Sequence, residues 1–117
     1  MRLNEVVHTG GLAVDGYGPG FFRVGGEPRE GAVLVLPSGV RPWGGPDDLG
    51  PILAVAGDVD VLLMGTGAEI AHAPPAMRER LEAAGIGLEV MASPAACRSY
   101  NVLLGEGRRV AVALLPV

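Results

Sequence analysis

The part of the chain that decides the fold reads VDVLLMGTG at residues 59–67, GLEVM at residues 87–91, SPAACRSYNVLLG at residues 93–105 and RVAVALL at residues 109–115. Short apolar runs rich in β-branched residues, such as the first, second and last of these, are typical of buried strands. The third run, like residues 76–84, repeats its apolar residues at helical spacing. This order predicts a strand–helix–strand–helix–strand unit, the pattern of an α/β domain.

The helix boundaries of this unit are marked by proline, serine and glycine. The two prolines at 74–75 favour a helix start, because proline lacks the N–H that would be unpaired there, and Gly85 fits the position after the end of that helix. Ser93 is predicted as the N-cap of the second helix, with Pro94 at its first position. Gly105 is predicted to end it.

The first half of the chain predicts β structure instead. Residues 12–17, 21–24 and 32–36 are predicted strands, and the glycine- and proline-rich turns between them favour hairpins. Residues 37–51 carry four prolines and four glycines around Trp43, which predicts a connecting loop. Trp43 is either a surface anchor for a partner or a lid over the core, and we favour the lid.

Composition excludes several functions. With 117 residues, 49% of them hydrophobic, the chain is predicted to form one globular domain over residues 1–117. The net charge is −4 and there is no lysine, so a P-loop or Schiff-base lysine is excluded and no nucleic-acid partner is expected. The single cysteine and the two histidines predict no disulfide, no metal site and no cofactor.

The expected location follows from the apolar runs and the first residues. The longest apolar runs, at 32–37 and 110–117, are far shorter than the ~20 residues that a membrane span needs. Residues 1–8 have neither the apolar run of a signal peptide nor the arginine-rich pattern of an import segment. A cytoplasmic location is therefore expected.

The first candidate site is Gly65-Thr66-Gly67, at the end of a predicted strand. In open α/β sheets, ligands collect beyond the carboxyl ends of the strands, and backbone N–H groups freed by glycine can bind an anion. A dinucleotide fingerprint would need glycine at position 70, which is Ile70. The alternatives are a ligand-binding loop and a tight turn at the strand end.

The second candidate site is Cys97 with Arg98 and Asn101, in the first turns of the second helix. A cysteine beside an arginine near a helix N-terminus can shift toward the thiolate. Nucleophilic catalysis also needs a base, and neither His8 nor His72 is placed near Cys97 by the sequence. A small, buried, unreactive cysteine is the favoured alternative.

Arg98 and Asn101 have a separate interpretation. Arg98 can pair with a carboxylate or phosphate, and Asn101 can hold the segment 65–67 by side-chain hydrogen bonds. Alternatively both are structural: Arg98 pairs with an acidic residue of this chain, and Asn101 satisfies backbone groups of a neighbouring turn. The structural alternative is slightly favoured.

Four segments of the chain together resemble one small domain family. They are Val61 to Gly67, Gly85 to Met91, Ala95 to Leu103 and Glu106 to Arg108, with a looser match at Gly31 to Pro37 and Trp43. They resemble the Mth-type domain family of unknown function, whose relatives include a mitochondrial complex I assembly factor and an adipogenesis-associated protein. The resemblance implies a three-layer α/β fold with a central mixed sheet of about five strands, the last of them antiparallel to its neighbours. It implies no enzyme activity and carries no complex I role to this chain.

Three functions follow, in order of preference. The first is a non-catalytic interaction or assembly protein with a protein partner, and a homodimer is compatible with it. The second is a domain that binds a small anionic ligand at Gly65, Thr66, Gly67, Arg98 and Asn101. The third is a thiol-dependent enzyme that uses Cys97.

Overall fold

The computed structural model describes residues 12–117, so His8 and the first residues used to predict a location lie outside the described part. The strands are β1 (Val14–Gly18), β2 (Phe21–Val24), β3 (Glu27–Glu30), β4 (Val33–Leu36), β5 (Gly39–Pro42), β6 (Val61–Thr66), β7 (Gly87–Met91) and β8 (Val110–Leu115). The helices are α1 (Gly50–Leu53), α2 (Pro75–Ala83) and α3 (Ser93–Gly105), with a 3₁₀ turn at Ala56–Asp58.

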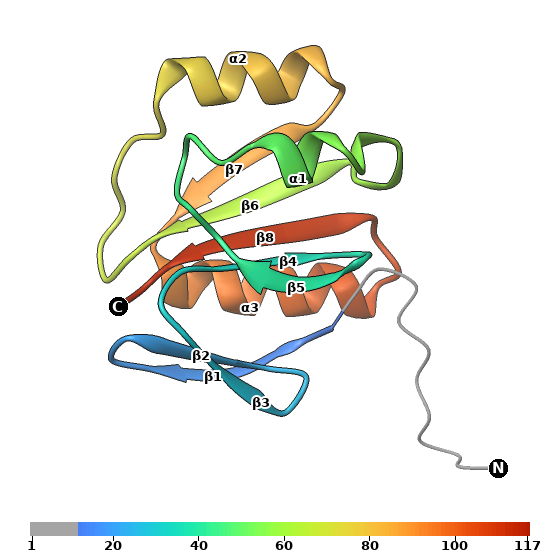
Figure 1. Ribbon diagram of the computed structural model, residues 1–117. Helices are drawn as coiled ribbons and strands as arrows, with labels where there is room; N and C mark the ends of the chain where they lie inside the picture. The colour runs from blue at the N-terminus through green and yellow to red at the C-terminus, as the bar shows by residue number, and fades with distance from the viewer. Residues whose placement is uncertain (1–11) are drawn as a thin grey trace, which may run out of the picture.

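These elements build a five-stranded mixed sheet and a three-stranded antiparallel sheet (Figure 1). The larger sheet has the order β5-β4-β8-β6-β7, and the smaller one the order β1-β2-β3. Helices α1 and α2 lie over one face of the larger sheet, while α3 and the smaller sheet lie over the other (Figure 1). The expected three-layer α/β fold, with a mixed sheet of five strands and hairpins in the first half, is therefore confirmed.

The direction of the last strand needs a correction. β8 lies between β4, to which it is antiparallel, and β6, to which it is parallel. The expectation that it would be antiparallel to its neighbours is right only for β4. A helical crossover returns the chain to the same end of a sheet, and because α3 is such a crossover, β8 runs in the direction of β6 and β7.

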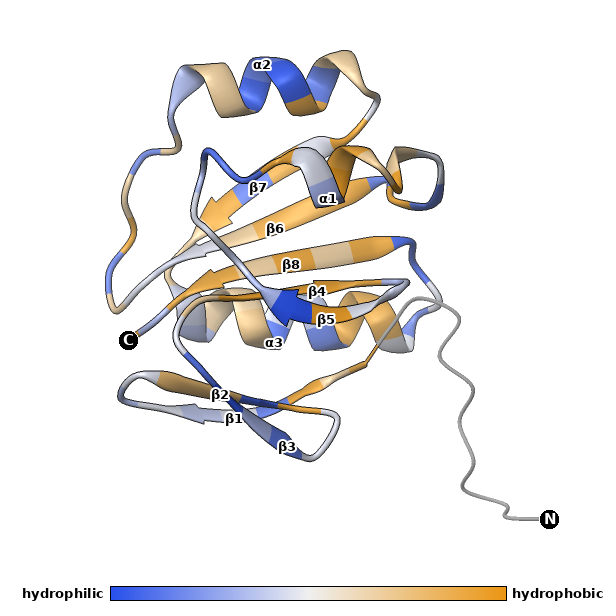
Figure 2. Cartoon of the chain, viewed as in Figure 1, coloured by the Kyte–Doolittle hydropathy of each residue, from blue (hydrophilic) through white to orange (hydrophobic). Residues whose placement is uncertain are grey.

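Two layers of apolar side chains hold the sheet between its covers. One layer, under α1 and α2, includes Leu62, Met64 and Leu81, and the other, under α3 and the smaller sheet, includes Leu63 and Tyr100. Strands β6 and β8 are almost wholly hydrophobic, whereas much of α2 is hydrophilic (Figure 2). A strand covered on both faces is apolar at every position, which is why the sequence pattern found the central strands.

The predicted helix boundaries are partly right. α2 begins at Pro75, and Gly85 after its end has a positive φ of 85°, as predicted. Ser93 is the first residue of α3 rather than its N-cap, which is Ala92. α3 also includes Gly105, and the glycine with positive φ is Gly107 (φ 79°).

The loop predicted at 37–51 contains the strand β5, which pairs antiparallel with β4. The strand was missed because Gly39 and Pro42 at its ends are typical turn residues. Trp43 is buried against the α1 side of the sheet, and its indole N–H donates to the carbonyl of Asp48 (3.1 Å). The interpretation of Trp43 as a lid over the core is confirmed.

Candidate functional site

Gly65 and Thr66 are the last two residues of β6, not part of a turn. Gly65 is buried, and a Cβ there would lie 2.7 Å from Cα of Ser93 and 2.8 Å from Cδ2 of Leu114. Real Cβ atoms do not come so close to their neighbours, so this glycine allows the start of α3 to pack directly on β6. Close packing, rather than access for a ligand, explains Gly65.

The polar groups of Gly67 and Thr66 form hydrogen bonds with other residues of the chain. The N–H of Gly67 donates to the hydroxyl of Ser93 (2.9 Å), and its carbonyl accepts the N–H of Ser93 (2.8 Å). The hydroxyl of Thr66 donates to the carbonyl of Glu69 (2.7 Å) and accepts the N–H of Ala71 (3.0 Å). These bonds use the groups that an anion at this strand end would need.

Asn101 lies away from these glycines. Its side-chain oxygen accepts the N–H of Val14 (2.9 Å), and its Nδ2 donates to the carbonyl of Val14 (2.7 Å). The residue that holds the segment 65–67 is Ser93, which bonds Gly67 and also donates to the carbonyl of Leu115 (2.6 Å). Of the two interpretations of Asn101, these hydrogen bonds match the favoured structural one, in which its amide satisfies backbone groups; those groups lie at the edge of β1 and not at segment 65–67.

Cys97 is buried in the layer between α3 and the sheet, with 4% of its surface exposed. Burial raises the pKa of its thiol to about 11, outweighing the opposite effect of the Arg98 charge. A reactive cysteine is accessible and has a lowered pKa. Cys97 has neither property and so matches the unreactive alternative.

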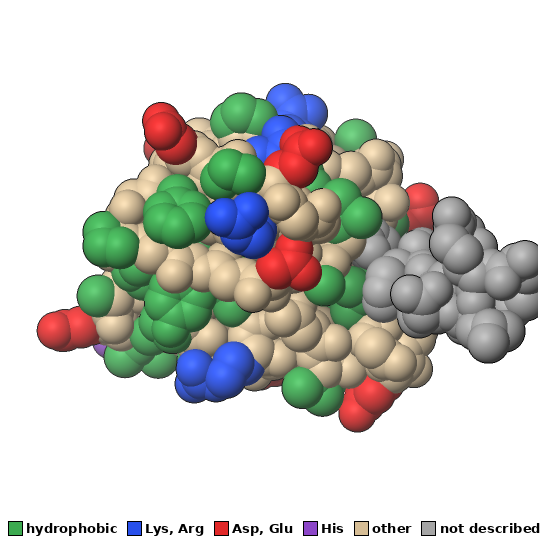
Figure 3. All heavy atoms as spheres, turned by 90° about the horizontal axis from the view of Figure 1, so that it is seen from below, with side chains coloured by type: hydrophobic (Ala, Val, Ile, Leu, Met, Phe, Trp, Pro, Cys, Tyr) green, Lys and Arg blue, Asp and Glu red, His purple; other side chains and the backbone are tan. Residues whose placement is uncertain are grey.

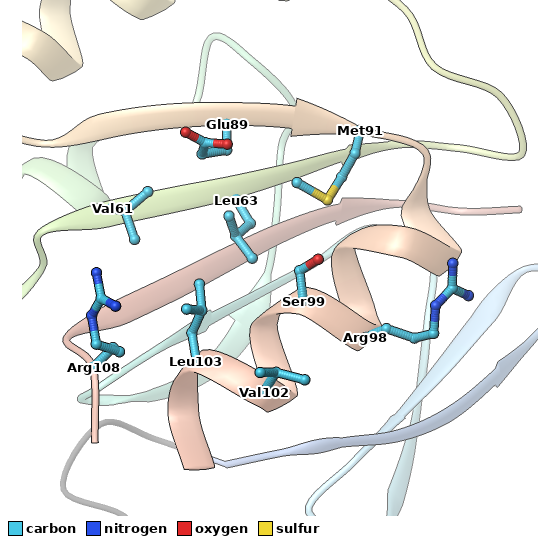
Figure 4. A pocket seen from close by; sticks show the side chains of 9 residues that line it. All are labelled: Val61, Leu63, Glu89, Met91, Arg98, Ser99, Val102, Leu103 and Arg108. Atoms are coloured by element: carbon cyan, nitrogen blue, oxygen red, sulfur yellow. The ribbon is translucent and has the colours of Figure 1, made fainter. Parts of the chain in front are cut away.

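Arg98 is exposed, and it stands at one end of a groove between α3 and β7, called the α3–β7 groove below. The groove has a volume of about 460 Å³. It is lined by Val61, Leu63, Glu89, Met91, Arg98, Ser99, Val102, Leu103 and Arg108. Figure 4 shows the side chains of β6 and β7 facing those of α3, with Arg98 and Arg108 at opposite ends. Arg98 is the predicted site residue that borders an open space on the surface.

The α3–β7 groove exists because α3 does not extend over the outermost strand. α3 packs on β6 and β8, so the α3-side face of β7, with Glu89 and Met91, stays partly open. On the helix side Val102 has 59% of its surface exposed, one of the largest values for a hydrophobic residue among residues 12–117. The floor is therefore apolar, whereas the two ends are basic.

The groove residues other than Arg98 were missed in the sequence. Val102 carries a usable signal, because it is an apolar residue on the side of the helix opposite Tyr100, which is fully buried. Glu89 and Met91 carry no comparable signal. Their place in the groove depends on which part of the sheet α3 leaves uncovered, which only the packed structure decides.

The described residues contain no cluster of metal-ligating side chains. No group of three or more His, Cys, Asp or Glu residues within 12–117 could hold a metal ion. In the same part of the chain, no helix is both long and apolar enough to cross a membrane. On the face turned to the viewer in Figure 3, hydrophobic side chains are interspersed with arginines and acidic residues.

The fold and the groove define a small α/β domain with a surface groove, and comparison with known proteins gives its family. The chain belongs to the family described as "Protein of unknown function (DUF498/DUF598)", which it matches over residues 14–115. A Bordetella pertussis protein described as a Mth938-like domain has the same fold, with a TM-score of 0.77 and 29% identity over 99% of this chain and 91% of that one. The resemblance to the Mth-type family is confirmed.

Three further relatives bear on function. An uncharacterized protein of Rhodobacter capsulatus is 52% identical over 100% of this chain and 94% of its own length. The Danio rerio NADH dehydrogenase (ubiquinone) 1 alpha subcomplex assembly factor 3 is 30% identical over 92% of this chain, which spans 66% of that protein. A crystal structure described as an outer membrane protein of Bartonella henselae has a TM-score of 0.86 and 34% identity, covering 95% of this chain and 99% of that one. The relatives of this chain therefore include a protein named as an assembly factor.

Proposed function

We propose that this protein is a non-catalytic domain of the assembly type, which binds a partner protein through the α3–β7 groove. The observation that carries the proposal is the apolar lining of the groove, where the exposed Val102 lies among the half-buried Val61, Met91 and Leu103. Contiguous apolar surface bordered by polar groups is typical of protein-binding sites. The relatives named as assembly factors support the same kind of role.

Three features of the candidate residues support a role without chemistry. Cys97 is buried with a raised thiol pKa, and the side chains of Thr66 and Asn101 form hydrogen bonds with backbone groups of the same chain. The groove itself presents two guanidinium groups, one carboxylate and one hydroxyl around an apolar floor. Such a lining suits recognition of a peptide surface, which combines apolar anchors with charged neighbours.

Affinity capture with matched variants tests the proposal. The full chain, tagged, is used to capture proteins from cells of its source, beside Val102→Glu and the control Tyr17→Glu. Both positions are exposed hydrophobic residues, but Tyr17 lies on β1, outside the groove. We expect a defined partner with the wild type and with Tyr17→Glu, and its loss with Val102→Glu.

Two outcomes would contradict the proposal. One is capture of further copies of this chain alone, which would indicate a homodimer instead. The other is a partner that Val102→Glu retains. The cytoplasmic location expected from the sequence is part of the same proposal, and fractionation of the source cells with an antibody to the chain tests it.

A small anionic ligand is the second candidate, because Arg98 and Arg108 flank the groove and Glu89 is the one acidic residue among the described residues that line it. Of the residues first considered for such a site, Arg98 is the one that lines the groove. Titration with inorganic phosphate, followed by NMR, should shift signals of the groove residues in the wild type but not in Arg98→Ala. Unchanged spectra in the wild type at millimolar phosphate would remove this candidate.

A further inference from the structure

Within residues 12–117 the two sheets have four edge strands, and three of these edges carry a proline or a side chain that caps both backbone groups of one residue. An exposed edge offers unpaired N–H and C=O groups to another chain, and proteins commonly block it with proline or with capping side chains. β3 contains Pro28 and β5 ends in Pro42. On β1, the amide of Asn101 bonds both backbone groups of Val14. Each of these three edges is therefore blocked against an added strand at one position.

The edge of β7 is different. The N–H of Gly87 donates to the carbonyl of Asp60 (2.9 Å), so Gly87 points its backbone groups toward β6. Backbone groups alternate along a strand, so Leu88 and Val90 point theirs away from β6, toward the open edge. Arg78 donates to the carbonyl of Leu88 (3.1 Å). No residue within 12–117 bonds the N–H of Leu88 or either backbone group of Val90, which leaves three groups for a new neighbour.

Hollows flank this edge on both faces of the sheet. On the α3 side lies the α3–β7 groove, beside Glu89 and Met91. On the α2 side lies a hollow of about 200 Å³, lined by Ile70, Ala71, His72, Ala73, Arg78 and Val90. Val102 in the first is 59% exposed and Ile70 in the second is 67% exposed, the two largest values among exposed large hydrophobic residues in 12–117.

We propose that β7 accepts an extended segment of the partner protein as an added strand. This inference rests on the proposed function and specifies its mode of binding. Side chains of a strand alternate between the two faces of a sheet, so successive residues of the segment would enter the α3–β7 groove and the hollow at Ile70 in turn. In this kind of recognition, backbone bonds supply affinity and the pockets for alternate side chains supply specificity.

Charge indicates the chemistry of the segment. The chain as a whole is acidic, with a net charge of −4, but Arg98 and Arg108 at the ends of the groove outnumber its one carboxylate, Glu89. A basic surface on an acidic protein favours an acidic ligand. The segment is thus an extended stretch that places an apolar residue in the groove and carries an aspartate or glutamate close to that residue.

A second copy of this chain fits the edge poorly. In a symmetric antiparallel pairing of two β7 strands about their middle residue, Glu89 would lie directly opposite the Glu89 of the other copy. Like charges directly opposite each other in a sheet are destabilising. The same carboxylate faces no such repulsion from a segment that places an apolar side chain beside it.

Photo-crosslinking in the full chain tests the mode of binding. Benzoylphenylalanine is introduced at position 102 in one variant and at position 70 in another, and mass spectrometry maps the residues of the partner to which each attaches. We expect both probes to attach to one short acidic segment, at residues an odd number apart in sequence, because the two hollows lie on opposite faces of the sheet.

The substitution Val90→Pro tests the backbone bonds, with Val90→Thr as its control. Both remove the valine, but only proline removes the outward N–H, and no bond to β6 is lost because that N–H faces the edge. We expect Val90→Pro to weaken partner binding about tenfold or more and Val90→Thr to leave it within about twofold. Thermal unfolding shows whether each variant is folded.

The outcomes separate the two proposals. A partner whose attached residues are spaced by three or four, or that binds Val90→Pro normally, would overturn strand addition and leave the proposed function intact. Attachment to lipid or to a second copy of the chain would also overturn it. Absence of any specific partner would overturn both. If Val90→Pro does not fold, the spacing of the attached residues decides alone.

Discussion

The carboxamide of Asn101 on α3 forms two hydrogen bonds with the backbone of Val14, accepting its N–H at 2.9 Å and donating to its carbonyl at 2.7 Å. The amide thus occupies the place that another strand would take beside β1. The hydroxyl of Tyr100 donates to the carbonyl of Leu12 (2.7 Å), which lies two residues before Val14 in the sequence. Together they attach the three-stranded sheet to α3, the helix that forms one wall of the groove.

Replacing Asn101 should therefore loosen the small sheet. Asn101→Leu leaves both backbone groups of Val14 without their partner, and we expect a loss of about 1–3 kcal/mol in the free energy of unfolding. Urea unfolding followed by the fluorescence of Trp43 measures it. Ser99→Ala, on the same helix, is the control and should change stability by less than about 0.5 kcal/mol. Equal stability of Asn101→Leu and the wild type would refute the structural role.

Gly65→Ala should destabilise the contact between β6 and α3. The new methyl group would lie 2.6 Å from Oγ of Ser93 and 2.8 Å from Cδ2 of Leu114, and the helix must shift to admit it. Forcing a methyl into a packed core costs about 1–3 kcal/mol. The same change at Gly87, where a Cβ would meet its nearest neighbour at 3.7 Å, is the control. Similar melting temperatures for the two variants would contradict the close packing.

Cys97 should make the protein less stable in alkali. Burial raises the pKa of its thiol from 9.0 to about 11, so the unfolded chain loses the proton first as the pH rises. The contribution of this thiol to stability is complete below pH 9 and declines as the pH rises from 9 toward 11. Tyr100 acts in the same direction, because burial also raises its pKa.

Two measurements check the role of Cys97. Urea unfolding between pH 8 and pH 10.5 should show a smaller decline with pH in Cys97→Ala than in the wild type. Alkylation by iodoacetamide at pH 8 should be slow in the folded protein and rapid in urea. Rapid alkylation of the folded protein would revive the thiol-dependent enzyme and contradict the burial described above.

Asp60 and Arg109 form an exposed ion pair, with Nη2 of Arg109 2.7 Å from Oδ1 of Asp60, next to the paired ends of β6 and β8. The guanidinium of Arg109 lowers the pKa of the Asp60 carboxyl from its ordinary value of 3.8. The ion pair therefore contributes to stability above about pH 4, and this contribution is lost at lower pH as the carboxylate takes up a proton. Because exposed pairs contribute little, Asp60→Asn should change the melting temperature less than Gly65→Ala does. A larger effect, or one insensitive to salt, would contradict this estimate.

Much of the fold could be predicted because its elements have strong local patterns. The runs at 61–66, 87–91 and 110–115 are apolar wherever both faces are covered, and the proline at the start of α2 and the glycine after its end mark that helix. β5 escaped prediction because its residues are typical of turns, and it becomes a strand by pairing with β4. The direction of β8 relative to β6 came from the crossover through α3, which a strand pattern does not encode.

The candidate site was harder to predict, and the reason lies in the hydrogen bonds. Gly65, Thr66, Gly67 and Asn101 have the residue types of a ligand site, but their polar groups and free space are taken by Ser93, Leu114, Glu69 and Val14. For Gly65, Gly67 and Asn101 these partners are distant in sequence, whereas Glu69 follows Thr66 by three residues. The sequence alone could not tell a polar group that awaits a ligand from one already satisfied within the protein.

By itself, then, the sequence determined the α/β class, the central strands and the two longer helices, because apolar periodicity and chain-breaking residues act over short distances. The family came from the resemblance of four sequence segments to known relatives. It also determined the absence of lysine and the single cysteine. Only the tertiary structure decided that Arg98 borders a groove, that Cys97 is sealed, and that the edge of β7 is open between two hollows. These properties depend on which surfaces α3 and the smaller sheet cover, and packing between distant segments sets that coverage.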